Sequence, residues 1–225
     1  MAGSTASALH GARWIDAAEP VELIWRNQHA PGGVLTRNER IANDEIVVVD
    51  GIRMTTKART ALDLGRHLTR DEAVARLDAL AHATGIAAQD VEPLLVRYRG
   101  SRGARRAREA IALMDAGGTS PKETWLRLLV LDDGLPKPQA QLMVHNGDYY
   151  PLAYLDLGWQ EYMVAAEYDG DQHRKDRKQY LKDIRRLEML ERLGWIVVRV
   201  VAEDRPLDVL NRIRQALISR GYRDT

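Results

Sequence analysis

The order of helical and strand-like segments after residue 119 is the feature that most constrains this fold. A helix begins at Ser120-Pro121-Lys122-Glu123, which combines an N-cap serine, a proline at N1 and a glutamate at N3, and it runs to about Asp132. Three strand-like segments, a long amphipathic helix, an apolar strand and a final helix follow at 141–145, 152–157, 162–169, 176–193, 195–201 and 207–218. The order α-β-β-β-α-β-α predicts a mixed sheet flanked by helices.

The first half of the chain predicts a smaller mixed region. Strands are expected at Val21–Trp25 and Glu45–Val49, and Asp50-Gly51 is typical of a tight hairpin turn. The expected helices lie at 55–67, 69–84, 90–98 and 104–114. The second of these helices opens with the capping box Thr69-Arg70-Asp71-Glu72 and ends at Gly85.

A glycine pair separates the two halves. Gly117-Gly118 ends the last helix of the first half and directly precedes the helix start at Ser120. We therefore expect two domains, 1–117 and 118–225. The expected fold class is α/β, of the mixed α+β kind.

Composition excludes several classes of protein. The 225 residues include no cysteine, which excludes disulfides, thiolate zinc sites and a cysteine nucleophile. No apolar run approaches the roughly 18 residues of a membrane span, and the N-terminus lacks the basic and apolar segments of a signal peptide. We expect a cytoplasmic protein without a membrane partner and leave the oligomeric state open, a dimer included. The net charge of +1 argues against a uniformly basic surface but permits local basic patches.

Three carboxylates interrupt the apolar strands of the second half. Asp156 stands between Leu155 and Leu157, while Glu167 and Asp169 occupy the next strand and share one of its faces, because side chains alternate along a strand. Acidic side chains are rarely placed among core-facing residues unless a partner satisfies them. These three acids are therefore the first candidates for a functional site.

The separation of the acids depends on the turn between their strands. A hairpin turn at Gln160-Glu161 would set Asp156 opposite Ala165 and make Glu167 its diagonal neighbour on the same face, about 7–8 Å away. Two carboxylates in that position can share one hard cation, which prefers oxygen ligands.

A longer set of residues in the second half supports a resemblance to a known family. It comprises Asp156, the run Ala166-Glu167-Tyr168-Asp169-Gly170-Asp171-Gln172-His173, the spacing Tyr180-x-x-Asp183-x-x-Arg186, and Gly194-Trp195-x-Val197-x-Arg199. Together these residues resemble the Vsr-like endonuclease domain known as domain of unknown function 559, over about residues 119 to 220. That family belongs to the PD-(D/E)XK nuclease superfamily, whose core order is α-β-β-β-α-β.

The resemblance implies a metal-dependent endonuclease that hydrolyses phosphodiester bonds of DNA, in DNA repair or phage defence. Carried over residue by residue, it implies that Asp156 and Glu167 hold Mg²⁺ (or Mn²⁺), with the Tyr168 carbonyl and Asp169 as further ligands. Glu123 occupies the position of a first-helix acid near the metal. It is also the N3 member of the capping box of its own helix, and both roles stay open.

One residue departs from the superfamily pattern. A lysine normally stands two residues after the glutamate and positions or activates the attacking water, whereas this chain has Asp169 there. Gln172, His173 or Lys182 could substitute, and the family context favours His173 as a catalytic residue. The alternative is a non-catalytic DNA-binding or regulatory protein, of toxin–antitoxin type, that keeps a degraded nuclease fold. A third alternative is a structural module in which the acids only form ion pairs, with Arg186 or Arg199 as the partners.

Two basic clusters are candidate contacts for the DNA backbone. Near the start of the long helix, the candidates for nucleic-acid binding are Arg174, Lys175, Lys178, Lys182 and Arg186. The alternative for them is a solvated helix face. A second cluster comprises Arg97, Arg99, Arg102, Arg105, Arg106 and Arg108. We expect this second cluster to be a solvated linker, with DNA contact as the alternative.

The first half carries a second resemblance. Ser7-Ala8-Leu9-His10-Gly11 and the segment 52–64, Ile-Arg-Met-Thr-Thr-Lys-Ala-Arg-Thr-Ala-Leu-Asp-Leu, are similar to segments of the AbiEi antitoxin-like family. In that family they usually follow a winged helix-turn-helix. The chain begins at the first of these segments, so we expect the wing to be missing, through truncation, a misassigned start codon or its absence from this member.

Overall fold

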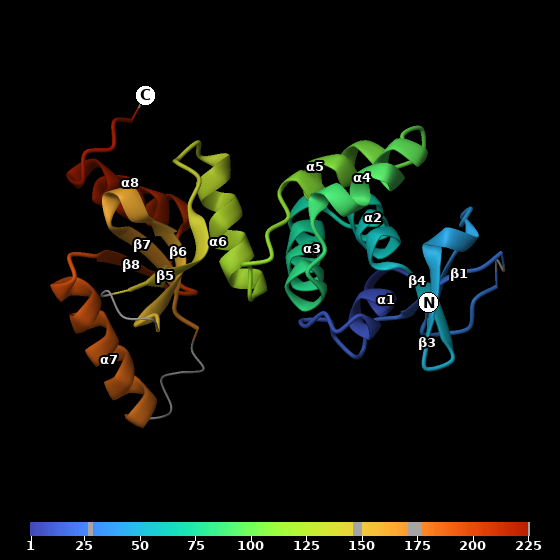
Figure 1. Cartoon of the computed structure of the whole chain (residues 1–225), viewed down its shortest axis with the longest axis horizontal. Helices are drawn as coiled ribbons and strands as arrows, with labels where there is room; N and C mark the ends of the chain where they lie inside the picture. The colour runs from blue at the N-terminus through green and yellow to red at the C-terminus, as the bar shows by residue number, and fades with distance from the viewer. Residues whose placement is uncertain (27–28, 146–149, 171–176, 225) are drawn as a thin grey trace. The chain divides into compact units, whose positions relative to one another are not determined.

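The computed structural model divides the chain into two compact units, Met1–Thr124 and Trp125–Thr225. It describes residues 1–26, 29–145, 150–170 and 177–224 (Figure 1). Both units combine helices with strands, so the fold is mixed α/β, as the sequence predicts. Among the helices in these ranges, none combines the length and the apolarity that crossing a membrane requires.

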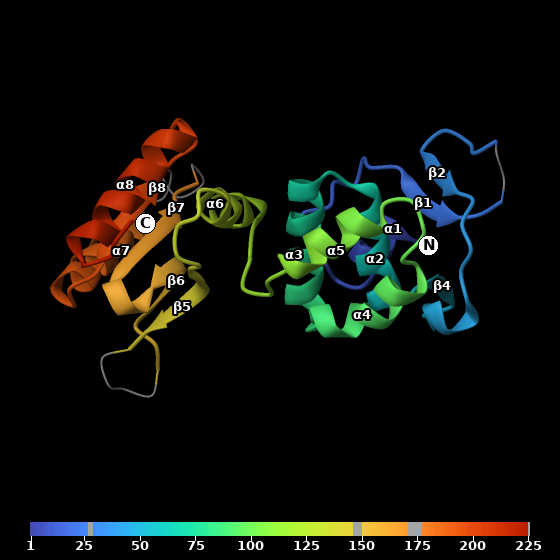
Figure 2. The same cartoon turned by 90° about the horizontal axis from the view of Figure 1, so that it is seen from above.

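The first unit is built around one buried helix, α2 (Lys57–His67), which packs against four others (Figures 1 and 2). These four helices are α1 (Gly3–Leu9), α3 (Arg70–Thr84), α4 (Ala88–Arg97) and α5 (Ala104–Ala112). Ala61, Leu62 and Leu64 of α2 are almost completely buried. Because its neighbours surround it, even the polar residues of α2 must find partners inside the protein.

Two small strand pairs complete the first unit. They are the parallel pair β1 (Val21–Ile24) and β2 (Val34–Arg37) and the antiparallel pair β3 (Ile46–Val49) and β4 (Ile52–Thr55), with the short 3-10 turn η1 (Asn43–Glu45) before β3. The predicted turn is confirmed, since Asp50 and Gly51 connect β3 to β4 with φ values of 51° and 78°. Both central residues of a tight hairpin turn of this kind need positive φ.

Three short elements of the first unit were not predicted: α1, β2 and β4. The two strands have four residues each, too few for an alternating pattern to stand out. Helix α1 contains glycine, two serines and a threonine, which are poor helix formers. It is stabilised by burial, because Ala6 and Ser7 are completely covered.

The two ends of α3 give opposite outcomes. Gly85 ends the helix in the left-handed conformation, with φ of 69°, as predicted. The capping box predicted at Thr69 is wrong, because Thr69 is the N-cap residue but its side chain makes no capping hydrogen bond. The helix is instead stabilised by packing, since Val74 and Leu77 are completely buried.

The units divide inside helix α6 (Pro121–Asp132) rather than at the predicted Gly117-Gly118 boundary. Asp78 of α3 is the physical reason. Its Oδ1 accepts a hydrogen bond from Asp115 N at 2.8 Å, and its Oδ2 accepts one from Thr124 Oγ1 at 2.7 Å. A Cβ on Gly118 would meet Asp78 Oδ2 at 2.6 Å, so this close approach requires glycine. These bonds hold residues 115–124 to the first unit.

The second unit contains a four-stranded sheet in the order β5-β6-β7-β8. Its elements after α6 are β5 (Gln139–Val144), β6 (Ala153–Trp159), the 3-10 turn η2 (Gln160–Tyr162), β7 (Val164–Tyr168), α7 (Arg177–Arg192), β8 (Ile196–Val200) and α8 (Pro206–Ser219). The first three strands are antiparallel, and β8 runs parallel to β7. Each element begins and ends within a few residues of its predicted bounds.

Helices cover both faces of this sheet (Figure 1). Val164 and Ala166 belong to a core that includes residues of α6 and α8, whereas Ala165 between them belongs to a core that includes Leu190 of α7. Since neighbouring side chains of a strand point to opposite faces, α7 covers one face and α6 and α8 cover the other. Gly194, with φ of 88°, follows α7 and precedes β8.

The connection between β6 and β7 corrects the predicted hairpin. Leu157 pairs with Ala166, and the strands are joined by residues 160–163, of which Met163 is left-handed with φ of 53°. The two-residue turn at Gln160-Glu161 is therefore wrong. A two-residue turn needs residues that adopt positive φ readily, and glutamine and glutamate do not. The chain uses a four-residue loop with a single left-handed residue instead.

Candidate functional site

A small cavity of about 220 Å³ lies beside the C-terminal end of β7, between the sheet and α7. It brings together the three acids that the sequence singles out. Its lining residues are Asp156, Glu167, Tyr168, Asp169, Asp183, Arg186, Leu187 and Arg199. We call this the acid–arginine cavity.

The register of β6 and β7 explains why two of the acids meet. Leu157 pairs with Ala166, and Asp156 and Glu167 are the next residues beyond this pair on the two antiparallel strands, in a register that differs from the predicted one. Asp156 Oδ2 accepts a hydrogen bond of 3.0 Å from the backbone N–H of Tyr168. This bond orients the Asp156 carboxylate across the strand pair.

Glu167 is engaged by an arginine of α7. Arg186 Nη1 donates to Glu167 Oε2 at 3.0 Å, and Arg186 Nη2 donates to Glu167 Oε1 and, at 2.7 Å, to the carbonyl of Tyr154. The hydrogen bond to Glu167 raises the pKa of Arg186 although burial opposes it, and the charges of Asp156 and Asp183 act in the same direction as Glu167. Arg186 is thus the cation around which the carboxylates gather.

Asp169 is engaged by an arginine of β8. Its carboxylate forms an ion pair with Arg199, and its backbone N–H donates to Val200 O at 2.8 Å, which continues the pairing of β7 with β8. The Asp169 side chain is 17% exposed and that of Arg199 is 47% exposed. The ion pairs with Arg186 and Arg199 that the sequence left open as an alternative are therefore present, at Glu167 and Asp169.

Glu123 does not line the acid–arginine cavity. Its carboxylate accepts hydrogen bonds from Thr119 N at 3.1 Å, Thr119 Oγ1 at 2.7 Å and Ser120 Oγ at 3.0 Å, while its own N–H donates to Ser120 Oγ at 3.3 Å. The bond from Glu123 N to Ser120 Oγ is the serine half of the predicted capping box, while the carboxylate accepts from the backbone N–H of Thr119, one residue before the N-cap. The structure places Glu123 in a capping role at the start of α6.

Several predicted residues fall outside what the structure describes. His173, Arg174 and Lys175 lie outside the described residues, and so does the side chain of Lys178. Lys182 is exposed on α7. Of the five predicted nucleic-acid contacts, only Arg186 lines the acid–arginine cavity among the described residues.

The second basic cluster is not the linker that the sequence predicts. Arg97 belongs to α4 and forms ion pairs with Asp44 and Glu45, and Arg105, Arg106 and Arg108 belong to α5. The prediction failed because the glycines around residue 100 end one helix and begin the next without separating two domains. The cluster is part of the first unit.

A buried ion-pair network in the first unit was not predicted. Arg59 is completely buried, and its guanidinium donates to Asp63 at 2.8 Å, Glu45 at 2.5 Å and Glu39 at 3.0 Å. Arg66 Nη1 donates to Glu39 at 2.7 Å. We call these residues the Arg59 network. The available signal was Arg59 and Asp63, which lie four residues apart among apolar residues of one helix.

Three members of this region come close enough to hold a metal ion. In the described part of the chain, the one group of three such side chains with ligand atoms within 4.8 Å of one another is Glu39, Asp63 and His67. Burial raises the pKa of Asp63 to about 6. Burial opposes ionisation of Glu39 too, but His67 and Arg66 outweigh it and lower the pKa of Glu39 to about 2. Arg59 and Arg66 already hold the carboxylates of Asp63 and Glu39, so a metal ion would have to displace them.

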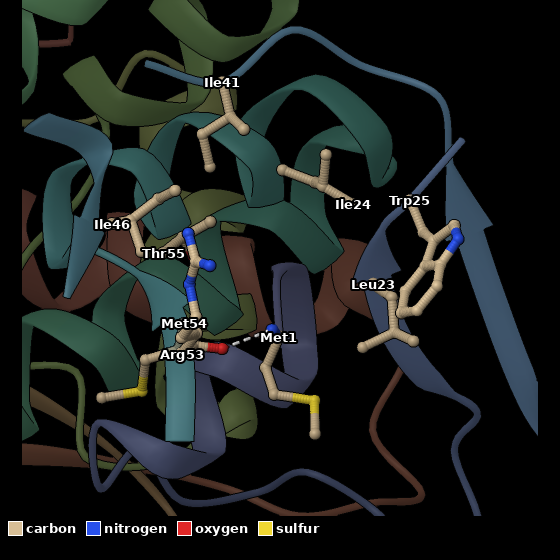
Figure 3. Close-up of a pocket in the computed structure, with 9 residues that line it drawn as sticks. All are labelled: Met1, Leu23, Ile24, Trp25, Ile41, Ile46, Arg53, Met54 and Thr55. Carbon is tan, nitrogen blue, oxygen red and sulfur yellow. Dashed lines mark hydrogen bonds between the residues drawn. The ribbon is translucent and has the colours of Figure 1, made fainter. Parts of the chain in front are cut away.

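A larger cavity of about 410 Å³ in the first unit has a different character (Figure 3). Its lining residues are Met1, Leu23, Ile24, Trp25, Ile41, Ile46, Arg53, Met54 and Thr55. The amino group of Met1 donates to the carbonyl of Arg53 at 2.8 Å (Figure 3). None of these lining residues is an acid or a histidine, so the cavity lacks the carboxylate and imidazole side chains that most often serve as metal ligands or general bases.

Comparison with known proteins identifies relatives without assigning a function. Over 156 residues, which are 69% of this chain, the sequence is 33% identical to the uncharacterized proteins Rv2248 and MT2308 of Mycobacterium tuberculosis, from strains H37Rv and CDC 1551. The matched part is 57% of the length of each of these relatives. No family model matches the chain. No solved structure matches it either.

Proposed function

We propose that the second unit is a metal-dependent endonuclease that hydrolyses phosphodiester bonds of DNA. One observation carries this proposal: Asp156 and Glu167 lie on paired strands and line one small cavity together with Arg186 and Arg199. Carboxylates of this kind hold hard cations, and guanidinium groups hold phosphate. The same cavity thus supplies both chemistries that phosphodiester hydrolysis requires.

The topology of the unit supports the same proposal. The chain order α6-β5-β6-β7-α7-β8, the sheet order β5-β6-β7-β8 and the acids on β6 and β7 resemble the core of PD-(D/E)XK nucleases. We also propose the Vsr-like resemblance of this unit, the AbiEi-like resemblance of the first unit, and a role in DNA repair or phage defence. These rest on the sequence motifs.

The donor set of the cavity is compatible with Mg²⁺ or Mn²⁺. Its candidate ligands are carboxylate oxygens, which suit hard cations better than imidazole or thiolate does. These acids already gather around a positive charge, the guanidinium of Arg186. The Arg186 side chain is 31% exposed, so it has room to turn away when another cation binds. Asp156 and Glu167 would hold the ion, with Tyr168 and Asp169 beside them.

Each residue of the cavity would then have a definite task. When bound, the ion would lower the pKa of a water molecule and neutralise charge on the phosphate. Tyr168 N–H keeps Asp156 oriented. Arg186 would exchange Glu167 for a phosphate oxygen, which frees that carboxylate. We propose that Arg199, beside Asp169, takes over the charge of the lysine that the superfamily pattern has and this chain lacks. Arginine stays protonated, so its task is positioning rather than proton transfer.

One observation favours a second candidate function. Glu167 and Asp169 are both paired with arginine, and a permanently closed cluster would hold no metal. In that case the unit would bind DNA without cutting it, as a regulatory protein of toxin–antitoxin type. The two candidates differ in whether a divalent cation displaces Arg186.

Cleavage of supercoiled plasmid DNA in Mg²⁺ or Mn²⁺ tests the proposal. We expect wild-type protein to nick the plasmid, and Asp156→Asn and Glu167→Gln to lower the rate by about a hundredfold or more, because each removes a ligand charge. Glu161→Gln is the matched control, since Glu161 is an exposed acid on the adjacent loop that does not line the cavity. His173→Ala tests whether the histidine contributes to catalysis.

Two results would contradict the nuclease. Nicking that persists in EDTA, or at equal rates in Asp156→Asn and Glu161→Gln, would place the activity elsewhere. Salt-dependent DNA binding without cleavage would support the regulatory candidate instead.

A further inference from the structure

We propose that the first unit contains a separate binding site for a phosphate group. A cavity of about 450 Å³ in this unit is lined mainly by cationic side chains. Its charged lining residues are Arg37, Glu39, Arg66, His67, Arg102 and Arg106. Counting four arginines against one glutamate leaves a formal excess of three positive charges, before any contribution from His67. We call this the arginine pocket.

The cationic side chains of the pocket come from three separate segments. Arg37 ends β2, Arg66 and His67 end α2, and Arg102 and Arg106 flank the start of α5. Local sequence therefore does not bring them together, and the packing of α2 against α5 does. Convergence of arginines from distant segments is costly, because like charges repel. Such a cluster is expected where a ligand of opposite charge offsets the repulsion.

Two glycines make the helix packing close enough to form the pocket. A Cβ on Gly103 would meet the carbonyl oxygen of Arg66 at 2.5 Å, and a Cβ on Gly65 would meet Ala107 Cα at 2.8 Å. Two hydrogen bonds fasten the same contact: Arg66 Nε donates to Arg102 O at 3.0 Å, and Arg106 Nη2 donates to Arg66 O at 2.8 Å. The pocket is therefore preorganised, which lowers the entropic cost of binding.

The cations of the pocket are unequally neutralised. Arg37 is paired with Glu22 at 2.9 Å, and Arg66 is paired with Glu39. By contrast, neither Arg102 nor Arg106 has an ion-pair partner in the described part of the chain. Their charges are available to a ligand.

Arg66 offers a further donor. Its side chain is only 7% exposed, with Nε bound to Arg102 O and Nη1 bound to Glu39. Within the described residues, its third nitrogen, Nη2, makes no hydrogen bond. Arg66 is thus a nearly buried guanidinium that lines a cavity with one nitrogen unused. This nitrogen can donate a charge-assisted hydrogen bond to an anion in the cavity.

The negative charge of Glu39 does not close the pocket to anions. Its carboxylate lies 2.9 Å from His67 Nε2, and it accepts hydrogen bonds from Arg59 and Arg66. Its carboxylate oxygens are therefore already engaged by these partners. Arg102 and Arg106 line the same pocket and, in the described part of the chain, have no acidic partner.

The size and donor geometry of the pocket fit a phosphate group. Its volume falls within the roughly 300–1,000 Å³ of small-molecule sites. Guanidinium forks match the tetrahedral oxygens of phosphate and sulfate in bidentate fashion. A phosphate group can be free phosphate, the end of a nucleotide or part of a nucleic-acid backbone. The chemistry of recognition is the same for all three.

Titration of the full chain with inorganic phosphate, at constant ionic strength against chloride, tests the site. We expect phosphate to bind, measured as heat by calorimetry and as a rise in Tm. Arg102→Gln should weaken binding by about tenfold, because one charge-assisted contact is lost. Arg102→Lys, which keeps the charge but not the fork, should weaken it less. Within the described residues the Arg102 side chain makes no hydrogen bond or ion pair, so these variants should fold normally.

The matched control is Arg105→Gln. Arg105 belongs to the same helix, is 87% exposed, pairs with Glu109 and does not line the pocket. If Arg105→Gln and Arg102→Gln lost phosphate affinity equally, the effect would come from the overall charge of the unit, and the proposed site would be wrong. The proposal would also be overturned if phosphate bound no better than chloride. It would likewise be overturned if an acidic peptide, but not phosphate, competed for the pocket.

Trinucleotides with and without a 5′-phosphate distinguish the sources of the phosphate group. If only the phosphorylated form binds in an Arg102-dependent way, the ligand is a terminal phosphate. If both bind, it is a backbone phosphate. All titrations are repeated in the Arg186→Gln, Arg199→Gln background, which removes the guanidinium groups of the acid–arginine cavity, so that this cavity cannot account for the result.

Discussion

Arg59 in the first unit and Arg186 in the second unit both gather carboxylates, under very different degrees of burial. Arg59 is completely buried and bonds to Asp63, Glu45 and Glu39. Arg186 is 31% exposed, bonds to Glu167 and lines a cavity. Both clusters consist of the same residue types, but solvent reaches only the cluster around Arg186.

This difference separates a structural role from a functional one. A buried ion pair cannot exchange partners without leaving a charge unpaired in a low-dielectric interior, so the Arg59 network is committed to the fold. An ion pair at a cavity can exchange its arginine for water, a cation or a phosphate at small cost. Burial, rather than residue type, therefore decides which acid cluster can take part in chemistry.

The largest expected effect follows from breaking the buried cluster. Arg59→Met leaves the buried Asp63 carboxylate without its nearest cation and removes one partner of Glu45, and we expect the free energy of unfolding of the first unit to fall by about 3–5 kcal/mol. Urea unfolding monitored by circular dichroism measures this loss. Arg105→Gln, on the surface of the same unit, should unfold like the wild-type protein. If Arg59→Met also unfolded like the wild-type protein, the Arg59 network would not contribute to stability as a buried cluster.

The pH dependence of the first unit should carry the next largest effect. The pKa of Glu39 is lowered to about 2, so Glu39 stabilises the folded state above its ordinary pKa. That stabilisation is lost as the pH falls from about 4.5 towards 2. We expect about 2 kcal/mol, a value reduced by solvent screening of this half-buried group. Unfolding curves at several pH values should show the loss in wild-type protein and a smaller one in Glu39→Gln.

A third experiment tests whether the cluster of the second unit is exchangeable. Arg186→Met removes the cation that competes for Glu167, so Mn²⁺ should bind roughly three- to tenfold more tightly than to wild-type protein. Calorimetric titration with Mn²⁺ measures the affinity. Arg185→Met, an exposed neighbour that does not line the cavity, is the control. Unchanged affinity in Arg186→Met would show that Arg186 does not compete with a metal.

The smallest expected effect concerns the exposed face of α7. Lys182→Ala should weaken DNA binding by about two- to threefold for all sequences and should lower the slope of log affinity against log salt by about one unit. A filter-binding titration at several salt concentrations measures both quantities. An unchanged slope would mean that Lys182 contacts no phosphate and that α7 presents only a solvated face.

Much of the fold of the second unit could be predicted from its sequence. Each helix and strand carries its own periodic pattern or end signal, such as Ser120 at the start of α6 or Gly194 after α7. In the first unit, α1, β2 and β4 could not be predicted in this way. These segments are short, and packing against the rest of the unit stabilises them more than local preference does.

The acids of the candidate site and its two arginines could be named from the sequence, but which arginine pairs with which acid could not. Asp156, Glu167 and Asp169 stand out because carboxylates in apolar strands need something to satisfy them. Their register was mispredicted, since it depends on a four-residue loop with Met163 in a left-handed conformation. The sequence left open the choice between a metal and an arginine.

The sequence by itself determined the order of the elements and the positions of the acids, because both depend on patterns of residues close to one another in the chain. Only the tertiary structure decided that Arg186 pairs with Glu167, that Arg59 is sealed in the first unit, and that Arg66, Arg102 and Arg106 surround one pocket. These contacts join residues 19 to 40 positions apart through long arginine side chains. Their geometry depends on how helices pack, which local periodicity does not encode.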